Sequence, residues 1–75
     1  MTGEIRGFGA SVRHLRETRG WSQEVLAERA DLNRSYLGEV ERGEASPSLA
    51  TAVKISSALG FRLSELLARA EGGSG

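Results

Sequence analysis

The chain has 75 residues, of which 39% are hydrophobic and 27% charged, and its ten basic side chains balance ten acidic ones. This length and composition are typical of one small globular domain, and no apolar run approaches the ~20 residues that a membrane span needs. The chain has no cysteine and one histidine, His14, so we expect a cytoplasmic binding protein without enzyme activity, metal, cofactor, small-molecule ligand or membrane partner.

Five helices are predicted, in chain order, from glycines, capping residues and apolar periodicity. A glycine in the left-handed conformation often ends a helix. Four glycines follow helix-compatible runs in this way: Gly20, Gly43, Gly60 and Gly72. Residues typical of helix N-caps precede four of the runs, at Ser22, Asn33, Ser48 and Leu63-Ser64. The predicted helices cover residues 8–19, 23–30, 34–42, 49–59 and 64–70. No segment alternates apolar and polar residues for long enough to form a strand.

Apolar side chains recur every three or four residues in each predicted helix, so each helix has one face to bury. The second, third and fifth helices are too short to be stable alone and must pack against the others. We therefore expect an all-α fold, a compact five-helix domain at residues 8–70. Flexible tails are expected at residues 1–7 and 71–75.

The second and third predicted helices are joined by only three residues, Asp31 to Asn33. Two short helices with such a connection must cross steeply, as in a helix-turn-helix. Close crossing needs a small inner side chain, which Ala27 supplies. The turn also needs a residue that tolerates a positive φ, which Asp31 does less well than glycine. The sequence therefore predicts a helix-turn-helix at its second and third helices.

Over about residues 8–67 the sequence resembles the phage repressor and Cro-type helix-turn-helix regulators. The residues that carry the resemblance are Leu15-Arg16, Gly20-Trp21-Ser22-Gln23, Leu26-Ala27, Leu32, Tyr36-Leu37, Val40-Glu41-Arg42-Gly43, Pro47-Ser48-Leu49 and Ala58-Leu59-Gly60. The run from Asn33 to Leu37, followed by Val40-Glu41-Arg42, is also similar to the small controller proteins of restriction–modification operons. Two positions depart from the family pattern. Asp31 stands where glycine is usual, and Gly38 lies within the third helix, at a cost of about 1 kcal/mol.

The resemblance implies that the third helix enters the major groove of double-stranded DNA with its N-terminal end toward the bases. The outward positions implied by this placement are Asn33, Arg34, Ser35, Tyr36, Gly38 and Glu39. Among them, Arg34 is suited to donate two hydrogen bonds to a guanine edge. Phosphate contacts are expected from Gln23, at the start of the second helix, and from Arg42, at the end of the third.

Four of the outward positions have two interpretations each. Ser35 can reach a base edge or a phosphate. Tyr36 can pack on the domain or touch a phosphate or a thymine methyl group. Glu39 can accept a hydrogen bond from a cytosine amine or pair with Arg42 three residues later. Gly38 either permits a close approach to DNA or has no part in binding.

An ion pair in the resembling family links the first helix to the end of the third, and the matching residues here are Arg16 and Glu41. We expect this pair to hold the third helix in place more than to add net stability. A different set of residues, apolar and crowded near the C-terminus, predicts an exposed patch and a dimer interface. They are Phe61, Leu63, Leu66 and Leu67.

The sequence thus predicts a sequence-specific DNA-binding transcriptional regulator, with a restriction–modification controller as one form of it. A module this small binds DNA too weakly by itself, so we expect a homodimer on a roughly palindromic operator. The alternative is an antitoxin-like protein-interaction module with secondary DNA binding, which the zero net charge favours slightly.

Overall fold

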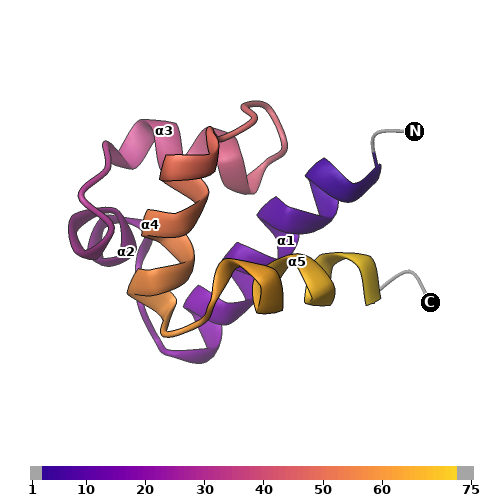
Figure 1. The fold of residues 1–75 in the computed structure, drawn as a ribbon. Coiled ribbons are helices and arrows are strands. Elements are labelled where there is room, and N and C mark those ends of the chain that lie inside the picture. The colour runs from indigo at the N-terminus through magenta and orange to yellow at the C-terminus, as the bar shows by residue number, and fades with distance from the viewer. Residues whose placement is uncertain (1–2, 73–75) are drawn as a thin grey trace.

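Five helices and no strand make up residues 3–72, the part of the chain that this computed structural model describes (Figure 1). The helices are α1 (Gly3–Thr18), α2 (Gln23–Arg29), α3 (Arg34–Glu41), α4 (Leu49–Leu59) and α5 (Leu63–Gly72). The predicted all-α class and the order of five helices are therefore confirmed. Within residues 3–72, no helix is both long and apolar enough to cross a membrane.

Capping residues account for most of the helix ends. The side chains of Ser22, Asn33 and Ser48 accept hydrogen bonds from backbone N–H groups in the first turns of α2, α3 and α4. Left-handed glycines follow α1, α3 and α4, at Gly20, Gly43 and Gly60. Helix α5 begins one residue before its predicted start. There the backbone N–H of Arg62 donates to the Glu65 carboxylate at 2.8 Å, which satisfies a donor at the helix end.

The N-terminal helix is longer than predicted, because α1 begins at Gly3 and not at Phe8. Residues 3–7 are therefore helical, in a segment where the sequence predicts a tail. At the other end, α5 continues through residue 72, two residues into the second predicted tail. Residues 1–2 and 73–75 of the predicted tails lie outside the described part of the chain.

Packing between α1 and α5 explains this difference, because the two helices lie side by side (Figure 1). They come so close that a β-carbon on Gly7 would lie 3.0 Å from the carbonyl oxygen of Ala70. Glycines lower the helix propensity of this segment. Most of the stability of a short helix in a protein comes from tertiary packing. The longer helix therefore depends on a contact that the local sequence does not indicate.

Close approach also explains Gly9, which lies where α1 crosses the end of α3. A β-carbon there would overlap the carbonyl oxygen of Val40 and lie 2.9 Å from that of Glu41. Both oxygen atoms are backbone and cannot move aside cheaply. Glycine at position 9 therefore sets how near α3 comes to α1.

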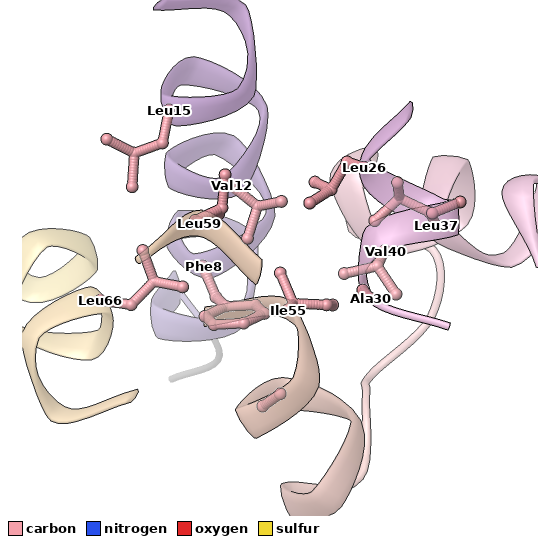
Figure 2. Packing of buried hydrophobic residues seen from close by; sticks show 12 residues of the cluster. Phe8, Val12, Leu15, Leu26, Ala30, Leu37, Val40, Ile55, Leu59 and Leu66 are labelled. Carbon is pink, nitrogen blue, oxygen red and sulfur yellow. The ribbon is translucent and has the colours of Figure 1, made fainter. Parts of the chain in front are cut away.

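All five helices contribute to one apolar core (Figure 2). Its hydrophobic side chains with at most 1% exposure are Val12, Leu26, Leu37, Val40, Ile55, Leu59 and Leu66. Burial of one such side chain stabilises the fold by roughly 1.5–3 kcal/mol. Because α3 packs on both α1 and α2, this core holds its inner face and leaves the opposite face to solvent.

Arg19 ties the end of α1 to the turn between α4 and α5. Its guanidinium donates to the carbonyl oxygens of Leu15, at 3.1 Å, and of Leu59. It also lies 5.8 Å from the ring centre of Trp21 and 5.5 Å from that of Phe61. A guanidinium at this distance from an aromatic face is attracted by the ring quadrupole. The turn before α5 is thus held against α1 by contacts from one side chain.

Candidate nucleic-acid interface

The turn between α2 and α3 has the sharp geometry that the sequence predicts. The backbone N–H of Leu32 donates to the carbonyl oxygen of Ala27 at 2.8 Å, and Ala27 itself is buried. Asp31 takes a φ of 58° and is the one non-glycine residue with a positive φ among the described residues. The left-handed conformation is unfavourable for a residue with a β-carbon. The turn therefore forms at a local cost that the packing of α2 on α3 offsets.

Four of the predicted outward residues are exposed on or just before α3: Asn33, Arg34, Ser35 and Glu39. The side-chain oxygen of Asn33 caps α3, since it accepts from the N–H groups of Ser35 at 2.8 Å and Tyr36 at 3.2 Å. Tyr36 is half-buried and packs against the core. Arg34 is the first residue of α3 and belongs to none of the ion pairs found among the described residues.

Gly38 was predicted to face outward, but the structure buries it. Two side chains lie over it. A β-carbon on Gly38 would lie 3.1 Å from Arg42 Nη1 and 3.5 Å from Gln23 Oε1. A position on the outer side of a helix is still covered when long neighbours fold across it, so the burial of Gly38 agrees with a place on the outer side of α3.

Arg16 and Glu41 are brought together by the crossing of α1 and α3. Arg16 Nε lies 2.8 Å from Glu41 Oε2, and Arg16 Nη2 lies 3.0 Å from Glu41 Oε1. The third donor, Nη1, reaches the carbonyl oxygen of Trp21 at 2.8 Å. The hydrogen bond to Glu41 raises the pKa of Arg16. Since the side chains are 10% and 1% exposed, this is a buried, bidentate pair.

Gln23 joins this pair from the start of α2, a contact that the sequence analysis missed. Its Nε2 donates to Glu41 Oε1 at 3.0 Å. The carboxylate of Glu41 therefore receives hydrogen bonds from both α1 and α2 while it sits on α3. The close sequence match of all three positions to the family motif was the one available signal of this contact.

Arg42 is exposed one residue beyond α3, and it pairs with Glu44 and not with Glu39, which one of the two interpretations of Glu39 had suggested. Its Nη2 lies 3.1 Å from Glu44 Oε1, whereas no ion pair forms between Glu39 and Arg42. The mutual hydrogen bond raises the pKa of Arg42 and lowers that of Glu44. Arg42 pairs with Glu44 because the chain reverses direction after α3. At this reversal the backbone N–H of Glu44 donates to the carbonyl oxygen of Glu39 at 2.8 Å.

The four predicted interface residues near the C-terminus do not form one exposed patch. Leu66 has no exposed surface and belongs to the core, so its assignment to an interface was wrong. Helical spacing turns Leu66 inward and its neighbour Leu67 outward, with 43% of Leu67 exposed. Phe61 and Leu63 are half-buried and pack against the core.

Two exposed apolar residues on α4 were not predicted as surface. Leu49 is 73% exposed and Val53 is 45% exposed. They are four residues apart and therefore lie on the same side of the helix. The described residues contain no group of three or more histidine, aspartate or glutamate side chains that could hold a metal ion.

Comparison with known proteins identifies relatives of this arrangement. Residues 12–66 match the family described as Helix-turn-helix. The control protein C.BamHI of Bacillus amyloliquefaciens is 45% identical over 69 residues, which are 89% of this chain and 85% of that protein. The immunity repressor protein of Bacillus phage phi105 is 39% identical over 59 residues, and the match spans 79% of this chain but 41% of the repressor's length.

A solved structure agrees with the sequence relatives. The restriction-modification controller protein C.AhdI from Aeromonas hydrophila superposes with a TM-score of 0.79 at 44% sequence identity. The superposition covers 83% of this chain and 94% of that one. Similarity in sequence and similarity in fold thus indicate the same group of proteins.

Proposed function

Because this chain belongs to the helix-turn-helix family of transcriptional regulators, we propose that it regulates transcription by binding a roughly palindromic operator as a homodimer. Family membership also confirms that the chain is a regulator and not an enzyme. We infer that it acts in the cytoplasm, as its bacterial and phage relatives would.

The observation that carries the proposal is the exposed face of α3. Its inner face is held by the core, and its first turn presents Arg34 and Ser35 to solvent beside Asn33. A helix that is fixed from behind and polar in front fits the major groove, which admits one α-helix. We assign base reading to Arg34 and Ser35, and phosphate contacts to Arg42 and Gln23.

Dimerisation is proposed from size and from exposed apolar surface. A single module contacts too few base pairs for useful specificity, whereas a two-fold pair reads two half-sites about one helical turn apart. Leu67 on α5 is exposed, and Phe61 and Leu63 are partly so. We place the interface at these three residues, without Leu66.

A restriction–modification controller is the regulator class that we favour. The support is the match to a control protein over 85% of that protein's length. The antitoxin-like alternative predicts tight protein binding with weak duplex binding.

Selection of bound sequences from random duplexes tests the proposal and returns the half-site and its symmetry. We expect a two-fold symmetric site, with a steep loss of affinity as salt rises because phosphate contacts release counterions. A failure to enrich any duplex would overturn the proposal and leave the antitoxin-like alternative.

Arg34→Ala then tests which residue reads a base. Loss of a bidentate guanine contact costs about 1–3 kcal/mol on the operator and little on a scrambled duplex. Arg13→Ala is the matched control, since Arg13 is an exposed arginine on α1 that pairs with Glu17 and belongs neither to α3 nor to the proposed interface. Equal losses on both duplexes for Arg34→Ala would make it a phosphate contact.

A further inference from the structure

The guanidinium of Arg19 lies between the C-terminal ends of two helices. Its Nη1 donates to the carbonyl oxygen of Leu15 in the last turn of α1 at 3.1 Å, and its Nη2 donates to that of Leu59 at the end of α4. The last four carbonyl groups of a helix have no partner within it, and the helix dipole places partial negative charge there. Arg19 therefore satisfies groups from two helices at once and ties their ends together.

The bond to Leu59 is the directional contact of this junction. It is the one side-chain hydrogen bond found between residues 7–42 and residues 49–70. The rings of Trp21 and Phe61, 5.8 and 5.5 Å from the guanidinium, add cation–π attraction. A hydrogen bond from a rigid fork to a carbonyl restricts rotation more than such attraction or apolar packing does. Loss of Arg19 therefore loosens the angle at the turn between α4 and α5.

Contacts continue from Arg19 to α3. The neighbouring Trp21 accepts a hydrogen bond at its carbonyl oxygen from Arg16 Nη1 at 2.8 Å. The other donors of Arg16 hold the carboxylate of Glu41, on α3, at 2.8 and 3.0 Å. Energetic coupling between separate sites is carried by chains of packed and hydrogen-bonded groups of this kind. Arg19, Trp21 and Arg16 thus connect the turn before α5 to α3.

The two segments that this chain connects lie at different ends of the domain. In Figure 1, α3 is at the top and the turn between α4 and α5 is at the bottom, beside the end of α1. That turn carries Phe61, which belongs with Leu63 and Leu67 to the proposed dimer surface. In a homodimer, the orientation of this surface relative to α3 sets the distance and rotation between the two α3 helices.

We propose that Arg19 fixes the orientation of the dimer surface relative to α3 and thereby determines which spacing between two half-sites the homodimer accepts. This proposal rests on the function proposed above. One base pair of spacing moves a half-site by about 3.4 Å and turns it by about 35° relative to the other. A rigid junction accepts one spacing, and a loosened junction accepts several. Arg19 acts here as a positioning residue, through the two elements that it joins.

A purely stabilising role for Arg19 makes a different prediction. In either role, loss of the guanidinium lowers the midpoint of thermal unfolding, because two helix ends lose a donor. If Arg19 only stabilises the fold, affinity falls by the same factor for every spacing. If it fixes the orientation, the wrong spacings lose less affinity than the right one. The ratio of affinities between two spacings therefore separates the roles.

The experiment measures binding of wild type and Arg19→Met to duplexes that carry the selected half-sites. The half-sites stand at the selected spacing, and at one base pair less and one more, all at one salt concentration because affinity depends on salt. We expect the preference for the selected spacing to be about tenfold smaller in Arg19→Met, the size of a lost hydrogen bond to a charged group. A preference that stays at its wild-type value would overturn the proposal.

Two control variants keep the junction intact. Arg13→Met removes an exposed arginine of the same helix, which pairs with Glu17 at 3.1 Å. Ile55→Val lowers stability by a small cavity in the core. Both are expected to keep the wild-type preference. If Ile55→Val reduces the preference as much as Arg19→Met does, the effect comes from lost stability and the proposal is wrong.

Arg19→Lys is a second test variant, in case the methionine variant does not fold. Lysine keeps a positive charge at the two helix ends but lacks the planar fork. We expect it to fold and to show a preference between those of wild type and Arg19→Met. A full wild-type preference in Arg19→Lys would mean that charge alone is sufficient and would refute the directional role.

A double-mutant cycle between Arg19→Met and Trp21→Leu tests the connection to α3. If the two residues act in one chain of contacts, the double variant reduces the preference no further than Arg19→Met alone. Reductions that multiply would show that the two residues act independently, and would refute the connection through Trp21.

The wild-type measurement separates this proposal from the one on which it rests. If the unchanged protein binds no duplex, or binds every spacing equally well, the proposed homodimer on a palindromic operator fails and the role of Arg19 fails with it. If wild type prefers one spacing and Arg19→Met keeps that preference, the function stands and the role of Arg19 alone is wrong.

Discussion

The junction of α2 with α3 and the junction of α4 with α5 are held together by different kinds of contact. At the first, a buried carboxylate on α3, Glu41, receives hydrogen bonds from Arg16 at 2.8 and 3.0 Å and from Gln23 at 3.0 Å. Hydrogen bonds are directional. This junction therefore fixes the position of α3 relative to α1 and α2.

The second junction combines one side-chain hydrogen bond, from Arg19 to the carbonyl oxygen of Leu59, with cation–π contacts and apolar packing. The ring of Phe61 lies 5.5 Å from the guanidinium of Arg19 and 4.9 Å from that of Arg69, and Leu66 fills the core behind it. Apart from that one bond, its contacts are less directional than the buried hydrogen bonds around Glu41, so this junction constrains the angle between helices less than the first one does. It also leaves Leu67 exposed.

The difference matches the two tasks proposed for the two ends of the domain. A helix that reads base edges must keep its angle, and directional bonds between buried groups provide that. A surface that pairs with a second copy needs apolar area, and packed side chains on α5 supply it. The following changes test the comparison, from the largest expected effect to the smallest.

Breaking the polar junction from one side is expected to have the largest effect. Arg16→Met leaves the carboxylate of Glu41 buried without its main partner, which costs about 3–5 kcal/mol of unfolding free energy. The double change with Glu41→Leu is expected to cost less, because no charge stays buried. Urea unfolding of both variants measures the difference. If the double variant is the less stable of the two, the Arg16–Glu41 pair adds net stability and does not only hold α3 in position.

The apolar junction is tested by a matched pair of neighbours on α5. Leu66→Ala opens a cavity in the core and is expected to cost about 2–5 kcal/mol. Leu67→Ala removes an exposed side chain and is expected to cost the monomer less than about 1 kcal/mol. Thermal unfolding measures both changes.

The dimer is tested on the same helix by sedimentation. Leu67→Glu is expected to give monomers, because a charge at an apolar interface is not solvated there. Leu49→Glu, on α4, is the control for an exposed leucine outside the proposed interface. Dimers that persist in Leu67→Glu but not in Leu49→Glu would move the interface to α4.

The turn of the polar junction offers a smaller, stabilising change. Asp31→Gly relieves the left-handed conformation at φ 58° and is expected to raise stability by up to about 1 kcal/mol, since the entropy of glycine offsets part of the gain. Asp31→Ala, which keeps the β-carbon, controls for loss of the carboxylate near Lys54, 3.8 Å away. Equal effects of glycine and alanine would assign the result to charge and not to the backbone.

The smallest effect is expected from breaking the exposed Arg42–Glu44 ion pair beyond α3. Its hydrogen bond lowers the pKa of Glu44 in the folded protein, so the stability it adds is present above the unfolded pKa and is lost as pH falls through the folded value. Glu44→Gln is therefore expected to differ from wild type near neutral pH and to converge with it in acid. A difference that grows as pH falls would contradict this sign.

Local signals in the sequence placed most helix ends correctly. Ser22, Asn33 and Ser48 bond to backbone N–H groups that only the first turn of a helix leaves free, so their positions hold whatever the helix packs against. The α1 start did not follow from local signals. It depends on α5, which lies more than fifty residues away in the chain.

The residues of the proposed site also fall into two groups, those that the sequence placed and those that only the tertiary structure placed. Apolar spacing and the three-residue turn determined that α2 and α3 cross, and the family pattern brought Arg16, Gln23 and Glu41 to notice one at a time. That the three meet at one carboxylate was decided by the tertiary structure, because they come from three helices whose crossing angles no local pattern encodes. The same holds for Gly38, covered by side chains from two segments, and for Leu66, which a one-residue step of the helix turns from surface to core.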